Sequence, residues 1–189
     1  MYEIAISNEQ TLLEIDEERL RSVARHVLGF EEVRAASVSI AIVDDAALRI
    51  LNRRHLGHDD DTDVLSFLLE CEQEDNAAAD VAVGPGQLVG WAESSRPTTN
   101  APRAADDDVA PPPRGRGKRI EGEVIASAEM AVKRAGEFHW SPIDELTLYV
   151  VHGLLHLAGY DDLADEERAL MRSRERALLS QWNLAPHES

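Results

Sequence analysis

The sequence predicts an α/β domain whose last long apolar helix carries a metal site. Three observations lead to this prediction. Short β-rich runs alternate with segments of helical periodicity, which is typical of α/β domains. A strongly apolar helical segment contains two histidines four residues apart, and a long segment near the middle of the chain has no periodicity. The 189 residues suit one domain with room for one insertion.

Four runs are predicted to be strands because they are β-rich or alternate in polarity: residues 2–6, 37–43, 63–69 and 122–127. Helices are expected from their capping signals. Asp16 and Asp44 are candidate N-caps of the first two helices, and Gly29 is expected to end the first. A third helix is predicted over about 128–136.

The two C-terminal helices have clear signals. Ser141 is the expected N-cap of the apolar helix, Pro142 suits its first turn, and Gly159 is a natural stop. A last, highly charged helix is predicted over about 164–179. No internal repeat is visible.

The segment 71–117 is rich in Ala, Gly, Pro, Asp and Ser, and we expect a low-complexity, disordered insertion there. It would interrupt a single metallohydrolase domain made of residues 1–70 and 118–189. Residues 88–92 are apolar enough to touch the body. The basic run at 114–119 is either an RNA-contacting patch or the end of a linker, and we favour the linker.

The charge limits the classes of function. The formal net charge is −17 and the pI is about 4.7, which argues against a protein that coats nucleic acid by bulk electrostatics. A nucleic-acid enzyme with a local metal site is still allowed. Cys71 is the one cysteine, so an intrachain disulfide and a four-cysteine zinc site are excluded. The sequence has no membrane-spanning run and no signal peptide, so we expect a cytoplasmic protein without membrane partners.

The chemistry of the chain centres on VHGLLHLAGYDD, residues 151–162. His152 and His156 are four residues apart on a helix, so both imidazoles lie on one face and can share an ion. Burying two histidines in an apolar helix is costly unless both have partners. Gly159 lets the chain turn, so that Asp161 or Asp162 can supply a third ligand. Three protein ligands and an open position are typical of catalytic zinc.

The sequence of this site resembles the YbeY family, whose hallmark is HGxLHLxGYDH; here the chain has HGLLHLAGYDD. Three further blocks are similar to that family: LNRRHLGHDDDTDVLSF (51–67), EGEVIASAEMA (121–131) and DEERALM (165–171). The resemblance spans about residues 1–70 and 120–182 and skips the insertion.

The resemblance implies a small mixed sheet of about four strands, packed with helices and a zincin-like metal helix. It implies a zinc-dependent, single-strand-specific endoribonuclease in small-subunit rRNA maturation and ribosome quality control. Its partners would be rRNA, the ribosomal small subunit and ribosomal proteins. By position, one Zn²⁺ per chain would be held by His152, His156 and Asp162, where Asp162 replaces the family's third histidine. Another divalent metal is an alternative.

The same alignment suggests catalytic residues. The family's arginine near the substrate phosphate falls on Leu56. Neighbouring candidates to replace it are Arg53, Arg54, His55 and His58, of which Arg53 and Arg54 are favoured. Glu123 stands where the family has aspartate and is a candidate base. Either water or a ribose 2′-hydroxyl can be the nucleophile in this scheme.

Two rival functions come from other classes. The first is a non-catalytic ribosome-assembly factor with a structural metal, which the loss of arginine at Leu56 favours slightly. The second is a metallohydrolase that acts on peptides or small amides. Gly153 weakens this second alternative, because zinc proteases of the HExxH type have their general base, a glutamate, at that position.

Overall fold

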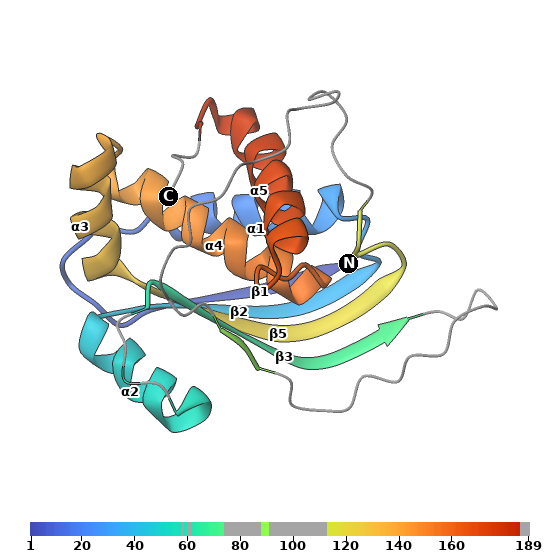
Figure 1. Cartoon of the computed structure of the whole chain (residues 1–189), viewed down its shortest axis with the longest axis horizontal. Helices are drawn as coiled ribbons and strands as arrows, with labels where there is room; N and C mark the ends of the chain where they lie inside the picture. The colour runs from blue at the N-terminus through green and yellow to red at the C-terminus, as the bar shows by residue number, and fades with distance from the viewer. Residues whose placement is uncertain (58, 60–61, 74–87, 91–112, 186–189) are drawn as a thin grey trace.

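A computed structural model of the chain describes residues 1–57, 59, 62–73, 88–90 and 113–185 (Figure 1). Within these residues, five strands form one sheet in the order β1-β2-β5-β3-β4. The strands are β1 (Tyr2–Asn8), β2 (Ala35–Val43), β3 (Val64–Gln73), β4 (Leu88–Gly90) and β5 (Lys118–Ser127). β1, β2 and β5 are parallel, whereas β3 is antiparallel to both β5 and β4. The predicted α/β class with a mixed sheet is confirmed, although the sheet has five strands rather than about four.

The helices form two layers, one on each face of the sheet (Figure 1). α1, α4 and α5 lie over one face and α2 lies on the other, while α3 packs beside α4. Their bounds are α1 (Glu17–Phe30), α2 (Asp45–Leu56), α3 (Ala128–Phe138), α4 (Pro142–Ala158) and α5 (Asp165–Leu179), and a 3₁₀ turn, η1 (Ser180–Trp182), ends the series. None of the described helices is long and apolar enough to cross a membrane.

The predicted caps determine where the helices begin. The side chains of Asp16, Asp44 and Ser141 each accept a hydrogen bond from a backbone N–H three residues later, at the starts of α1, α2 and α4. These bonds satisfy donors that have no partner inside the helix. Gly159 ends α4 with φ of +107°, a conformation that glycine adopts without strain.

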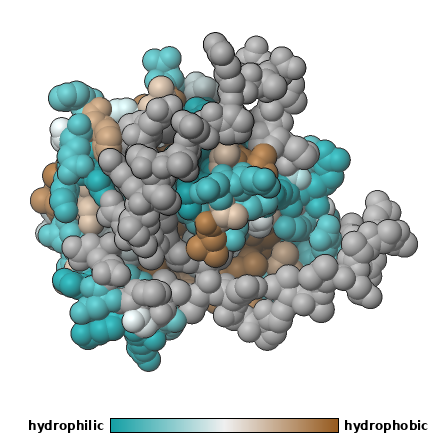
Figure 2. All heavy atoms as spheres, in the orientation of Figure 1, coloured by the Kyte–Doolittle hydropathy of each residue, from teal (hydrophilic) through white to brown (hydrophobic). Residues whose placement is uncertain are grey.

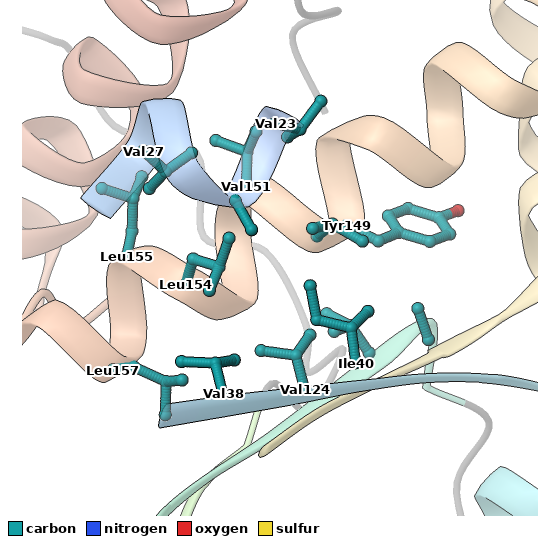
Figure 3. Close-up of a cluster of buried hydrophobic side chains, with 14 of the residues drawn as sticks. Val23, Val27, Val38, Ile40, Val124, Tyr149, Val151, Leu154, Leu155 and Leu157 are labelled. Atoms are coloured by element: carbon teal, nitrogen blue, oxygen red, sulfur yellow. The ribbon is translucent and has the colours of Figure 1, made fainter. Parts of the chain in front are cut away.

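The main core lies between the sheet and the helices, and α4 is at its centre (Figure 3). Leu154 and Leu157 of α4 point toward Val38 and Val124 of the sheet, while other α4 side chains point toward α1. A helix that is apolar on all sides is expected to be largely buried, and 12 of the 17 residues of α4 are buried. On the outer surface, Figure 2 shows hydrophilic residues over the region of α2, with hydrophobic patches elsewhere.

The predicted insertion at 71–117 lies largely outside the described residues, in the ranges 74–87 and 91–112. The described parts of it belong to the body: residues 71–73 continue β3, and 88–90 form β4. The prediction that 114–119 is a linker end is wrong. A Cβ added to Gly115 would lie 2.6 Å from the Val33 side chain, so this run packs tightly on the body, and β5 begins at Lys118.

Candidate metal centre

His152 and His156 lie on consecutive turns of α4, and their rings face each other. The two Nε2 atoms are 3.0 Å apart, and the rings are nearly perpendicular, with an interplanar angle of 80°. Only 12% of the His152 side chain and 2% of the His156 side chain are exposed. The helix therefore presents two imidazole nitrogens to one small buried site.

Asp162 completes a group of three that could hold a metal ion, with all three ligand atoms within 4.8 Å of one another. Its carboxylate oxygens lie 4.0 Å from His152 Nε2 and 3.9 Å from His156 Nε2. Ligand atoms at about 2.0–2.1 Å around a tetrahedral ion are separated by roughly 3.3–3.4 Å. The observed separations of 3.0, 3.9 and 4.0 Å bracket that value, so a small shift would close the site.

The outer nitrogen of each histidine has an acceptor. His156 Nδ1 lies 3.0 Å from the carbonyl oxygen of Tyr160, and His152 Nδ1 lies 2.7 Å from Glu175 Oε1. Both partners can only accept here, so both Nδ1 atoms carry the proton, and the Nε2 lone pairs of the neutral rings point at each other. Two lone pairs at this distance repel unless a cation lies between them. Partners on the outer nitrogens are typical of metal-binding histidines.

The pKa values of the two histidines move in opposite directions. Burial lowers the pKa of His152, but the hydrogen bond and charge of Glu175 outweigh it, and the net shift is upward. Burial, together with the charge on His152, lowers the pKa of His156 to about 3. His152 is therefore the more basic of the two rings, and a metal ion would compete with a proton for its Nε2 atom.

The turn after α4 aims Asp162 at the histidines. Asp161 Oδ1 accepts hydrogen bonds from the backbone N–H groups of Asp162 and Leu163, at 2.8 and 3.3 Å. Asp161 therefore stabilises the turn, whereas Asp162 is the aspartate whose carboxylate faces the histidines. Burial raises the pKa of Asp162, which is the expected effect of desolvation on a carboxyl group.

Gly153 explains how α4 comes so close to the sheet. A Cβ at this position would lie 2.6 Å from Val124 of β5 and 3.4 Å from Val64 of β3. No larger side chain fits, so α4 cannot carry the glutamate that HExxH proteases place next to their first histidine. The contact also brings the start of β3 beside His152.

Asp63, immediately before β3, is a buried carboxyl near this site that the sequence analysis missed. It is 8% exposed, and its Oδ1 atom has no hydrogen-bond partner among the described residues. Burial raises the pKa of Asp63 to about 6, although the charge of His152 acts in the opposite direction. A carboxyl with this pKa can exchange a proton near neutral pH.

The second residue that the sequence analysis missed is Glu175 of α5, the partner of His152. It is 7% exposed, and its neighbour Arg174, 4% exposed, pairs with the fully buried Glu31 at the end of α1. α5 therefore holds α4 in place through Glu175 and is itself held by Arg174.

The structure does not bring the three other candidates to this site. Arg53 and Arg54 are exposed on the last turn of α2, across the sheet from α4 (Figure 1). Glu123 alternates with Val124 on β5, so its side chain points to the face opposite the one on which α4 packs, where it is paired in register with Phe67. The side chain of Leu56 lies outside what the structure describes.

Comparisons with known proteins show which family the chain resembles. The family model described as Endoribonuclease YbeY matches residues 5–183. A curated protein of that description from Salinibacter ruber is 33% identical, over 97% of this chain and 94% of its own length. Another from Moorella thermoacetica is also 33% identical, over 94% and 96% respectively. A solution structure from Thermotoga maritima aligns over 97% of this chain and 92% of its own, with 18% identity and a TM-score of 0.49.

Proposed function

Because the chain belongs to the YbeY family of endoribonucleases, we propose that it is a metal-dependent endoribonuclease that cleaves single-stranded RNA during maturation of small-subunit rRNA. The observation that carries this proposal is the pair of facing Nε2 atoms in His152 and His156, with the carboxylate of Asp162 beside them. The partners would be rRNA, the small subunit and its proteins, and the site of action the cytoplasm.

We propose zinc as the metal. Two imidazole nitrogens and one carboxylate oxygen form a donor set found in zinc hydrolases, and three protein ligands leave a position open. When bound, zinc would supply a Lewis acid that lowers the pKa of a water molecule and stabilises negative charge on the scissile phosphate.

Residues of the chain would orient the imidazoles, exchange a proton and contact the RNA phosphates. Glu175 and the Tyr160 carbonyl keep the two imidazoles oriented by accepting hydrogen bonds from their Nδ1–H groups. Asp63, with its raised pKa of about 6, is available to take or give a proton beside His152. The exposed Arg53 and Arg54 would contact RNA phosphates away from the cleavage centre, because phosphate contacts position a nucleic acid without reading its sequence.

The test is cleavage of a labelled single-stranded RNA, with the same sequence as duplex RNA and as DNA for comparison. We expect cutting of the single strand alone, its loss after chelation, and its return with added zinc. His156→Ala should abolish cutting. His139→Asn, which changes an exposed histidine at the end of α3 and tolerates its left-handed backbone, should not.

The ends of the RNA products identify the nucleophile. Attack by water gives a phosphate on one fragment and a hydroxyl on the other, whereas attack by the 2′-hydroxyl gives a 2′,3′-cyclic phosphate. Absence of cleavage by zinc-loaded, folded protein, or equal cleavage after chelation, would overturn the proposed activity.

A further inference from the structure

The turn that carries Asp162 is held at both ends by one arginine from a distant part of the chain. We define the ligand loop as residues 159–164, between the end of α4 and the start of α5. At its first end, Arg114 Nη1 donates to the Gly159 carbonyl at 3.3 Å, and the guanidinium lies 5.0 Å from the centre of the Tyr160 ring. At its other end, Arg114 pairs with Glu167 in the first turn of α5 through both Nη atoms, at 2.5 and 3.0 Å.

Arg114 is itself anchored to the body. Its backbone N–H donates to Glu31 Oε2 at 3.1 Å, and the Tyr160 hydroxyl donates to the same oxygen, also at 3.1 Å. Glu31 is completely buried. Gly115, the next residue, is pressed so closely against Val33 that it has no room for a Cβ. The guanidinium is therefore extended from a fixed point toward the ligand loop.

Lys118 supports the same region from the start of β5. Its Nζ donates to the Ala158 carbonyl at 2.8 Å, the last residue of α4. Together, Lys118 and Arg114 supply positive charge and hydrogen bonds to carbonyls that α4 leaves unpaired at its end. Two of the four cations in this basic run, Arg114 and Lys118, are thus bound to the C-terminal end of α4.

We propose that Arg114 is a positioning residue of the metal centre, which sets metal affinity by fixing the ligand loop. It touches neither histidine nor the Asp162 carboxylate. It holds the loop that sets the distances of 3.9 and 4.0 Å from Asp162 to the histidines. The same loop presents the Tyr160 carbonyl that orients His156. This inference rests on the proposed function, since it requires that the three ligands bind metal.

The expected loss of zinc affinity follows from the positioning role of Arg114. Residues that orient metal ligands typically change metal affinity by about 10–100-fold when replaced. Arg114 acts through the backbone of the loop, so we expect Arg114→Gln to weaken zinc binding by about tenfold. Glu167→Gln, which removes the same ion pair from its other side, should weaken it in the same direction.

The matched control is Arg116→Gln. Arg116 lies two residues away and forms an ion pair with Glu32, but both side chains are well exposed, at 68% and 49%. Exposed pairs contribute little. This variant carries the same charge change in the same run and should bind zinc as the wild type does.

The experiment titrates zinc into the metal-free full chain against a chromophoric chelator, and the visible spectrum of the cobalt-loaded protein reports the coordination geometry. We expect weaker binding and an altered cobalt spectrum for Arg114→Gln, with unchanged circular dichroism. In an Asp162→Ala background, Arg114→Gln should have a smaller effect on affinity, because the carboxylate it positions is gone and only the contact of the Tyr160 carbonyl with His156 remains.

Three results would overturn the inference. The first is zinc affinity in Arg114→Gln equal to that of Arg116→Gln. The second is an undiminished effect of Arg114→Gln in the Asp162→Ala background, which would indicate general loosening of the fold. The third is a wild type that binds no zinc, which would also remove the metal from the proposed function. In the first two cases the proposed function stands and this inference alone fails.

Discussion

The ion pair between Arg174 and Glu31 provides a sharp test of how the body supports the site. Arg174 Nε lies 2.5 Å from Glu31 Oε1, and the two side chains are 4% and 0% exposed. Arg174→Met would leave the Glu31 carboxylate buried without its cation. Breaking a buried pair from one side costs about 3–5 kcal/mol.

The lower end of that range applies here. Glu31 keeps its hydrogen bonds from the Tyr160 hydroxyl and the Arg114 backbone, and methionine fills part of the space over Phe30 that the guanidinium occupies. We expect a loss of about 3 kcal/mol in the free energy of unfolding. For a domain of 150–250 residues, this corresponds to a decrease in Tm of about 6–12 °C.

The assay is thermal and urea unfolding of the metal-free chain, followed by circular dichroism. Arg116→Met, which breaks an exposed pair, is the control and should cost less than about 1 kcal/mol. Adding Glu31→Gln to Arg174→Met removes the buried charge and should recover part of the loss. If Arg174→Met were no more destabilising than Arg116→Met, the buried pair would not support the fold as argued.

Three further predictions concern the helix and its histidines. Gly153→Ala should be about 1–3 kcal/mol less stable in urea unfolding than Gly29→Ala, because its Cβ meets Val124 whereas Gly29 has open space; equal stabilities would contradict the close packing. Glu175→Gln should weaken zinc binding about tenfold and Glu175→Ala more, in the chelator titration, and unchanged affinity would exclude its orienting role. Below the raised pKa of His152, which lies above 6.5, zinc affinity should fall about tenfold per pH unit, because a proton must leave before the metal binds; a flat profile would count against His152 as a ligand.

Much of the fold could be predicted from local signals. Capping residues and periodicity act within a few positions, so the starts of α1, α2 and α4 follow from Asp16, Asp44 and Ser141. The three candidate metal ligands could also be predicted: the helix turn places His152 and His156 together, Gly159 allows Asp161 or Asp162 to approach them, and the family resemblance selects Asp162. β4 was missed because a three-residue strand has no periodicity of its own and depends on its pairing with β3.

The residues that support the site were missed because they come from distant segments. Arg174 and Glu175 occupy the buried stripe of α5 between Met171 and Leu178, at helical spacing. Charged residues on such a stripe are a signal that could have been used, although it does not name their partners. Glu123 was a candidate base, but the structure places it on the face of β5 away from α4. Val124 and Ile125 point to opposite faces and are both buried, so the pattern of this strand does not indicate which face α4 covers.

The central claim is that His152, His156 and Asp162 form one metal site. The most direct measurement is elemental analysis of the purified chain and of Asp162→Ala after both are supplied with zinc and washed. We predict about one zinc per wild-type chain and a clear loss in the variant. A wild type without metal, or an Asp162→Ala chain that retains it in full, would contradict the claim.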